Sequence, residues 1–217
     1  LGDTAEVVPL AHERGIKVMA LAGAVKHALS HARKGADVII AQGYEAGGHT
    51  GTIGNFPLIP QIVDAVRPKP VVAAGGISDG RGVAAALALG AVGVWCGTTF
   101  LVTQEGGINP IYKKQILNGT SEDFVRTAYT SGHFARHYRS DVIKAWMSSG
   151  LEAMPTPYQG NAMDEVRRAA EAANRVDLLH VPGGQVAGML SEQRNNVPAR
   201  EIVERMVLSS CPPGGVV

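Results

Sequence analysis

A histidine among glycines is the clearest candidate for chemistry in this chain. His49 lies in the stretch 41–51 (AQGYEAGGHTG), which directly follows an apolar run at 36–40. Glycines let the backbone adopt positive φ and lie close to a ligand, and an imidazole with a pKa near ~6.5 can transfer protons at neutral pH. Parallel α/β folds keep their chemistry on loops that follow buried strands. We therefore expect His49 to be catalytic rather than a histidine bonded only to the backbone, with Glu45 either its partner or a surface charge.

Two further glycine turns follow apolar runs. Gly75-Gly76 comes after 70–74, and Gly97-Thr98 comes after 91–96. In (β/α)₈ barrels the loops after the last two strands commonly hold a phosphate, because backbone N–H groups reach an anion where no side chain blocks them. Either turn alone could simply be a tight connection. Two of them, one unit apart, predict a phosphate-bearing ligand.

The elements that must position these residues repeat a strand–helix unit. Apolar runs without polar alternation are typical of strands in a parallel sheet, and they occur at 16–21, 37–41, 70–74 and 91–96. Between them, apolar residues at helical spacing predict helices around 25–32, 59–66 and 83–89, the last capped by Ser78 or Asp79 and followed by Gly90. The fold class is therefore α/β, either a doubly wound sheet or a (β/α)₈ TIM barrel, and the glycine turns favour the barrel.

A barrel needs eight strands, and this sequence shows four. We expect strands 5–8 of a barrel, preceded by a missing first half, with exposed apolar side chains on both edge strands. The expected organisation is residues 1–103 as this second half of the barrel, 104–209 as a mostly helical cap that returns to its mouth, and 210–217 as a flexible tail. Within the cap, apolar spacing predicts helices around 166–173 and 199–206 and a short strand within 124–130.

Composition excludes several classes of partner. The chain has 217 residues, a net charge of +1 and no long run of one sign, so we expect neither nucleic acid nor a membrane as a partner. The basic cluster 136–139 (RHYR) is interpreted as a solvated face. Two cysteines cannot make a disulfide framework, which indicates a reduced, cytoplasmic compartment, and Cys96 reads as a small core residue. His133 and His137 are four residues apart, but without a third ligand no metal site is expected.

The sequence resembles the nitronate monooxygenase family over about residues 15–209. The resemblance is carried by the stretch 41–51, by 74–77 (AGGI) and by 95–100 (WCGTTF). It implies an FMN-dependent (β/α)₈ barrel with a helical cap, and it implies that His49 is the histidine beside the flavin, acting as base or substrate anchor. Gly184-Gln185 resembles the segment that returns toward the barrel. The implied flavin-binding residues are Gln42, Gly47, Gly75, Gly76, Trp95, Cys96, Gly97 and Thr98.

The resemblance also implies a reaction. The expected enzyme oxidises alkyl nitronates with O₂ to a carbonyl compound and nitrite; the flavin supplies the redox chemistry, and the protein supplies position and electrostatics. Two other enzyme classes remain open, a flavin-dependent enoyl-acyl-carrier-protein reductase and an NAD(P)H:quinone reductase, both of which use a nicotinamide cofactor. A truncated, non-catalytic fragment is the alternative from another class.

Overall fold

The computed structural model describes residues 4–210, which divide into two compact units. Unit 1 contains the described residues up to Glu45, Gly51–Cys96, and those from Val203 onward; unit 2 contains Ala46–Thr50 and Gly97–Ile202. The expected tail, 210–217, lies outside the described residues apart from Ser210. No helix within 4–210 combines the length and apolar character needed to cross a membrane.

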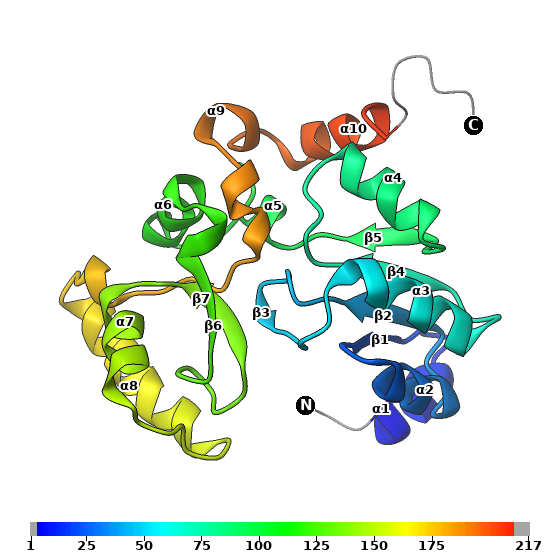
Figure 1. The fold of residues 1–217 in the computed structure, drawn as a ribbon, viewed down its shortest axis with the longest axis horizontal. Helices are drawn as coiled ribbons and strands as arrows, with labels where there is room; N and C mark the ends of the chain where they lie inside the picture. Colours follow the sequence, from blue (N-terminus) through cyan, green and yellow to red (C-terminus); the bar gives the residue numbers. More distant parts are fainter. Residues whose placement is uncertain (1–3, 211–217) are drawn as a thin grey trace. The chain divides into compact units, whose positions relative to one another are not determined.

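Unit 1 is built on a parallel sheet. Its strands lie side by side in chain order (Figure 1), and they are β1 (Met19–Ala22), β2 (Val38–Gln42), β4 (Val71–Ala74) and β5 (Gly93–Trp95). This confirms the four predicted strands, their direction and their order. The first strand begins at Met19 rather than Ile16, because its ladder with β2 starts at the pair Met19 and Val38.

Helices connect these strands, as the helical spacing predicts. They are α2 (Val25–Arg33), α3 (Asn55–Val66) and α4 (Gly80–Ala88); α1 (Thr4–His12), which was not predicted, precedes β1. Asp79 caps α4, since its carboxylate accepts hydrogen bonds from the backbone N–H groups of Arg81 and Gly82. Gly90 follows the helix with φ of +95°, a conformation that favours glycine. The alternation of parallel strands and helices is that of half of a (β/α)₈ barrel, which is the fold class predicted.

The core of unit 1 lies between the sheet and its helices. Strand residues Ile39 and Val71 pack in one buried cluster with Leu58, Ile59 and Ile62 of α3. Side chains on the edge strands are less covered. Met19 and Leu21 of β1 are 42% and 51% exposed, and Val92 and Trp95 at β5 are 64% and 49% exposed. The prediction of exposed apolar side chains on both edge strands is therefore confirmed.

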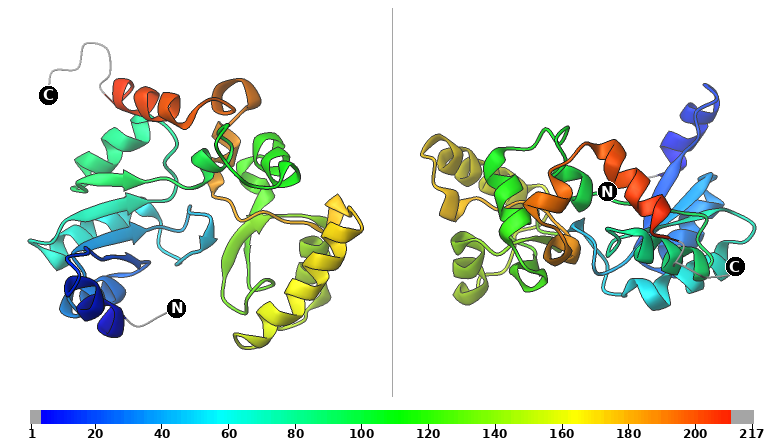
Figure 2. Two further views of the ribbon diagram at one scale, coloured as in Figure 1. Left: turned by 180° about the vertical axis from the view of Figure 1, so that it is seen from behind. Right: turned by 90° about the horizontal axis from the view of Figure 1, so that it is seen from above.

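Unit 2 contains an antiparallel sheet that the sequence only partly predicts. Its strand order is β3 (Gly48–His49), β7 (Ala135–Tyr138) and β6 (Phe124–Thr127), and β6 and β7 form a hairpin that is seen side-on in the left view of Figure 2. A strand within 124–130 is thus confirmed, whereas the assignment of His49 to a loop is wrong, because it pairs with Ala135. Phe124 packs in the core of this unit with Val102, Ile116, Val181, Ala187 and Leu190.

The rest of unit 2 is mostly helical. Helices predicted around 166–173 and 199–206 are confirmed as parts of α8 and α10, although α10 ends within unit 1. The helices are α5 (Thr98–Leu101), α6 (Pro110–Asn118), α7 (Asp141–Ser149), α8 (Tyr158–Ala172), α9 (Glu192–Asn195) and α10 (Ala199–Leu208), with 3₁₀ turns η1 (Ser121–Asp123), η2 (Val176–Leu178) and η3 (Gln185–Met189).

Candidate active site

The carboxyl ends of three neighbouring strands meet at one edge of the parallel sheet. The register pairs Gln42 of β2 with Ala74 of β4, and Ala74 with Trp95 of β5. Each strand is followed by residues singled out from the sequence. Gly75 and Gly76 come directly after β4, with φ of +93° and +70°, in the left-handed region that side chains disfavour. In parallel α/β sheets this edge is where ligands bind.

A carboxylate and an amide hold the backbone at this edge. Both carboxylate oxygens of Glu45 accept a hydrogen bond from the backbone N–H of Asn55, each at 3.1 Å, at the first turn of α3. The Asn55 side-chain Nδ2 donates to the carbonyl of Gly75, and its Oδ1 is buried without a partner. Glu45 is therefore neither a partner of His49 nor a free surface charge, the two interpretations the sequence left open. It fixes a helix start beside the glycine turn.

His49 projects from β3 and has one close polar partner. Its Nε2 lies 2.8 Å from Oγ of Ser131, and its ring lies 6.3 Å, centroid to centroid, from that of His133. Partial burial of the ring and the nearby His133 hold the pKa of His49 below its ordinary value. The imidazole is therefore neutral over a wider pH range, which suits a group that accepts a proton.

Ser131 can fix which nitrogen of His49 carries the proton. Its Oγ lies 3.4 Å from the carbonyl oxygen of His133, to which it can donate, and 3.4 Å from the backbone N–H of His133, from which it accepts. When the serine hydroxyl donates to that carbonyl, its oxygen accepts from the Nε2–H of His49. Nδ1 is then left as the basic nitrogen.

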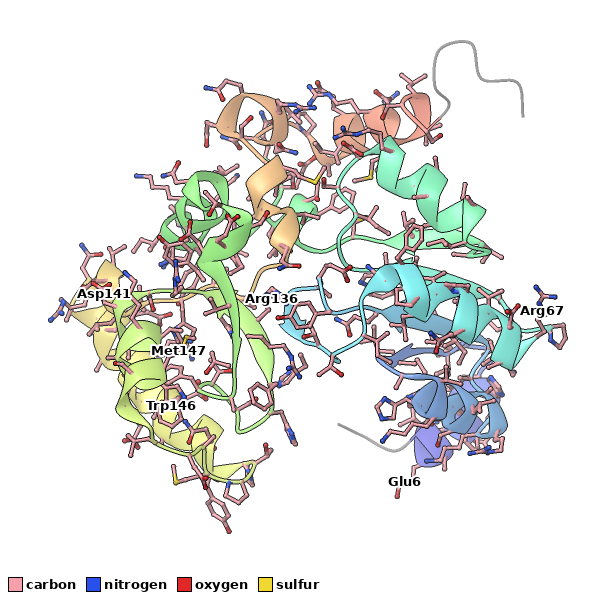
Figure 3. The ribbon with its side chains drawn as sticks, viewed as in Figure 1. Glu6, Arg67, Arg136, Asp141, Trp146 and Met147 are labelled. Carbon is pink, nitrogen blue, oxygen red and sulfur yellow. The ribbon has the colours of Figure 1, made fainter. Side chains whose placement is uncertain are left out.

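A buried arginine anchors the start of the glycine stretch. Arg136, labelled in Figure 3, is 2% exposed; its Nε donates to the carbonyl of Ala46 at 3.2 Å and its Nη1 to that of Phe124 at 2.7 Å. The interpretation of residues 136–139 as a solvated face is wrong, because Arg136 and His137 lie on the buried β7. Arg136 instead joins β6 to the segment that leads into β3.

The segment Gly183-Gly184 packs against the same glycine stretch. A Cβ at Gly47 would lie 2.6 Å from the carbonyl carbon of Gly183, so no larger residue fits there. The N–H of Gly184 donates to Oγ1 of Thr98 at 2.8 Å. Within unit 2, Gly47 and Thr98 thus both contact the segment that precedes Gln185. Each residue therefore has a structural role in addition to the flavin contact that the family resemblance implies.

The remaining predicted contacts lie at the end of β5 and directly after it. Trp95 is half exposed, while burial raises the pKa of the Cys96 thiol to about 11. Cys96 is thus a neutral thiol rather than a nucleophile at neutral pH. A Cβ at Gly97 would meet no atom within 4 Å, and Oγ1 of Thr99 is buried without a partner. Open backbone and unused polar atoms are features that a bound phosphate-bearing cofactor would use.

Three residues of the site were missed by the sequence analysis. Asn55, Ser131 and Arg136 act on residues 10 to 90 positions away, so their roles depend on pairings that spacing does not reveal. No group of three or more His, Cys, Asp or Glu residues suited to a metal occurs within 4–210, and His137 lies on a strand rather than on the helix that a His133–His137 pair would need.

The family model and the most similar proteins described below point to the same family. The model of the family described as nitronate monooxygenase matches residues 2–209. A Mycobacterium tuberculosis protein, Rv1533, whose name gives it provisionally as a monooxygenase, is 42% identical over 93% of this chain and 55% of its own length. A "Probable nitronate monooxygenase" of Staphylococcus haemolyticus is 35% identical over 88% of this chain and 56% of its own. The chain thus spans about half the length of these relatives.

Two solved structures resemble the fold of this chain to the same degree. FabK from Thermotoga maritima matches with a TM-score of 0.84 and 33% identity, over 97% of this chain and 66% of that one. Nitroalkane oxidase from Streptomyces ansochromogenes also has a TM-score of 0.84, with 30% identity over 95% of this chain and 60% of that one.

Proposed function

The chain belongs to the nitronate monooxygenase family. We propose that the protein is an FMN-dependent oxidoreductase, which oxidises alkyl nitronates with O₂ to a carbonyl compound and nitrite. The observation that carries the proposal is the contact between His49 and Ser131 on the strand formed by the glycine stretch. It gives the one histidine of that stretch an oriented ring, and partial burial, by lowering the pKa, keeps that ring neutral and able to accept a proton at neutral pH.

The residues that would hold FMN are those that the family resemblance implies. Gln42 and Trp95 end β2 and β5, Gly75 and Gly76 follow β4, and Cys96, Gly97 and Thr98 follow β5 in the chain. The positive φ at Gly75 and Gly76, the open side of Gly97 and the unpartnered Thr99 hydroxyl support this assignment. When bound, FMN supplies the electron acceptor that no side chain of this protein can replace.

His49 has two roles in this mechanism, as a base and as a positively charged anchor. Toward a neutral nitroalkane, its basic nitrogen removes the α-proton, which leaves the negative charge on the nitro oxygens of the nitronate and the positive charge on the imidazole. The resulting imidazolium then holds the nitronate by charge attraction. Ser131 keeps the ring in one orientation during both steps, and the Arg136 contact to Ala46 fixes the strand that carries it.

The proposal is tested by turnover of the purified complete protein. We expect a visible flavin spectrum, oxygen uptake and nitrite release with ethyl nitronate, and no bleaching of the flavin by NADH under argon. Rapid bleaching by NADH together with no nitrite release would favour the reductase alternatives. Absence of bound flavin after supplementation with FMN would contradict the proposal and favour a non-catalytic fragment.

A further inference from the structure

A second histidine ring lies beside that of His49. The ring of His133, in the turn of the β6–β7 hairpin, meets the His49 ring at its edge, with the centroids 6.3 Å apart and the ring planes at 70°. His133 is exposed, so it exchanges protons with solvent. Neither proton abstraction by His49 nor the orientation of its ring by Ser131 uses this second imidazole. Because a histidine changes its charge near neutral pH, the charge beside His49 depends on pH.

The backbone at position 133 helps to hold the two rings in place. The N–H of His133 donates to Oγ of Ser131 at 3.4 Å, and the carbonyl oxygen of His133 lies 3.4 Å from the same Oγ. That Oγ also lies 2.8 Å from Nε2 of His49. The serine hydroxyl therefore links the two residues through contacts in which the His133 side chain takes no part. A substitution at position 133 can change the charge there and leave these contacts intact.

The arginines near β3 carry a charge that does not change with pH. Arg126 of β6 donates through Nε to Oγ1 of Thr50 at 3.1 Å, and Arg136 of β7 donates to the carbonyl of Ala46. An arginine stays protonated throughout the range in which a protein is folded, so both guanidinium groups add a constant field. In the described part of the chain, no carboxylate forms a hydrogen bond or an ion pair with His49.

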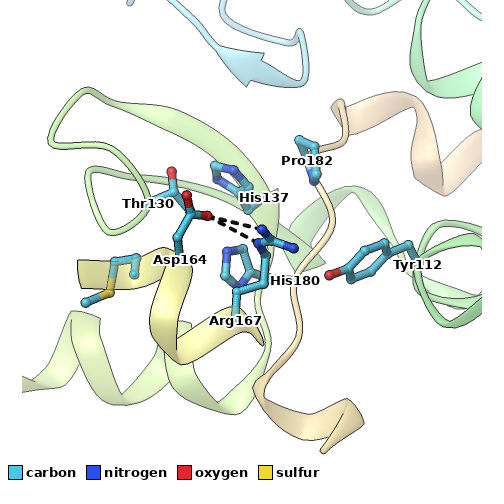
Figure 4. Close-up of a pocket in the computed structure, with 8 residues that line it drawn as sticks. Tyr112, Thr130, His137, Asp164, Arg167, His180 and Pro182 are labelled. Carbon is cyan, nitrogen blue, oxygen red and sulfur yellow. Dashed lines mark hydrogen bonds and ion pairs between the residues drawn. The ribbon is translucent and has the colours of Figure 1, made fainter. Parts of the chain in front are cut away.

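The two other histidines of unit 2 are buried. Figure 4 shows them, His137 on β7 and His180 in the segment before η3, among the residues that line a pocket; their rings lie 5.3 Å apart. Burial lowers the pKa of both, for His137 to about 3. His137 is therefore neutral near neutral pH, and His180 gains its proton at lower pH than an exposed histidine does. His133 is thus the group beside the His49 ring whose charge changes near neutral pH.

We propose that His133 is a positioning residue that acts through His49: its positive charge repels a proton from the His49 ring, so that His49 still accepts a proton from substrate on the acid side of neutrality. Burial lowers the pKa of His49 most, and the nearby His133 lowers it further. Without the charge at position 133, more of the His49 rings would already be protonated at low pH and could not act as a base. This consequence for catalysis rests on the proposed function, whereas the coupling of the two rings rests on their geometry.

The coupling is measured on the complete protein without turnover, by an NMR titration of histidines labelled with ¹³C in the ring. His49→Gln identifies the signal of His49. We expect the midpoint of its titration to move to higher pH in His133→Gln, and to stay at or below the wild-type midpoint in His133→Lys, because a lysine keeps its charge well above neutral pH. His27→Gln, which removes an exposed histidine of α2, is the control and should leave the midpoint unchanged. No movement in His133→Gln, or the same movement in His133→Lys, overturns the proposal.

The effect on catalysis is measured as the ratio of kcat/KM with nitroethane at about pH 5.5 to that at about pH 7.5. Two unit charges 6.3 Å apart in water change an equilibrium roughly threefold, so this ratio should fall roughly threefold in His133→Gln and stay near wild type in His133→Lys. A merely structural role would lower the rate at both pH values, and an equal loss at the two values would overturn the proposal. If the His49 titration moves as expected in a protein that does not oxidise nitroethane, the coupling of the rings stands and the proposed function fails.

Discussion

His49 Nε2 and Ser131 Oγ lie 2.8 Å apart, although 82 positions separate them in the chain. The pairing of β3 with β7 creates this contact, because His49 lies beside Ala135 in the ladder and Ser131 lies in the turn of the β6–β7 hairpin. The parallel sheet aligns the strand ends that carry Gln42, Gly75 and Trp95, and the antiparallel sheet likewise positions His49. It brings a residue of the glycine stretch to a partner that the sequence places far away.

Replacing Ser131 should leave the His49 ring less well oriented while the imidazole itself remains. Ser131→Ala should lower kcat with a neutral nitroalkane about five- to tenfold, the equivalent of roughly one hydrogen bond, and change KM little. Turnover of a preformed nitronate should change less. Ser148→Ala, on the exposed end of α7, is the control and should leave both rates unchanged. A Ser131→Ala enzyme with wild-type kcat on both substrates would show that the contact does not orient the base.

Two glycines with nearly equal positive φ offer a test of cofactor binding with a built-in control. Gly76 has φ of +70°, and a Cβ there would lie 3.2 Å from Cβ of Glu45; Gly15 has φ of +69° with nothing within 4 Å. Gly76→Val and Gly15→Val should each lose about 1–2 kcal/mol of stability from left-handed strain. Only Gly76→Val should also lose bound flavin, measured as the ratio of visible to ultraviolet absorbance. Equal flavin content in the two variants would remove Gly76 from the binding site.

Arg136 should matter more to folding than its charge suggests. Arg136→Met leaves the carbonyls of Ala46 and Phe124 without their donor, at a cost of about 1–3 kcal/mol each. We expect the free energy of unfolding in urea to fall by about 2–6 kcal/mol. Arg139→Met, which removes a half-exposed ion pair with Asp123 at 3.5 Å, should cost less than about 1 kcal/mol. Similar losses in the two variants would argue against Arg136 as an anchor.

The buried histidines make a signed prediction for stability against pH. Burial lowers the pKa of His137 to about 3, and it also lowers that of His180. The unfolded chain binds protons near pH ~6.5 and the folded chain does not, so stability falls as pH drops from about 6.5 toward 3. The slope should be about 1.4 kcal/mol per pH unit for each such histidine.

Chemical unfolding between pH 4 and 7 measures this slope. His137→Leu should remove the contribution of one proton, and His27→Gln, an exposed substitution on α2, should leave the slope unchanged. An unaltered slope in His137→Leu would mean that this histidine does not titrate on unfolding.

Sequence reasoning predicted the parts of the fold that local pattern determines. Apolar runs and helical spacing predicted β1, β2, β4 and β5 with their order, Gly90 after α4, and a cap at Ser78 or Asp79, of which Asp79 is the one formed; strand burial and helix ends depend on nearby residues. Strand β3 was missed because two residues carry no period. Arg136 was taken for a surface residue because its partners are backbone carbonyls, which leave no trace in residue type.

The candidate site also contains residues that their type reveals and residues that only a long-range pairing reveals. His49 and the glycine turns were identified from residue type, since glycine and histidine in one loop already suggest a ligand and a proton. Ser131 and Asn55 were not, because a serine or an asparagine acquires its role only from the pairing that brings it close. The flavin contacts assigned by resemblance remain predictions, and for Gly47 the packing against Gly183 is a structural reason for glycine in its own right.

The central claim is that His49 is the base of a nitroalkane-oxidising flavoenzyme, and His49→Ala assayed on a nitroalkane and on its preformed nitronate tests it most directly. With 2-nitropropane we expect kcat/KM to fall on the order of 10²–10⁴-fold, because general-base catalysis contributes that much. With the nitronate of 2-nitropropane, which has no proton left to lose, the fall should be at least tenfold smaller. Equal losses on both substrates would mean that His49 only anchors charge, and no loss on either, in a variant that retains its flavin, would contradict the account.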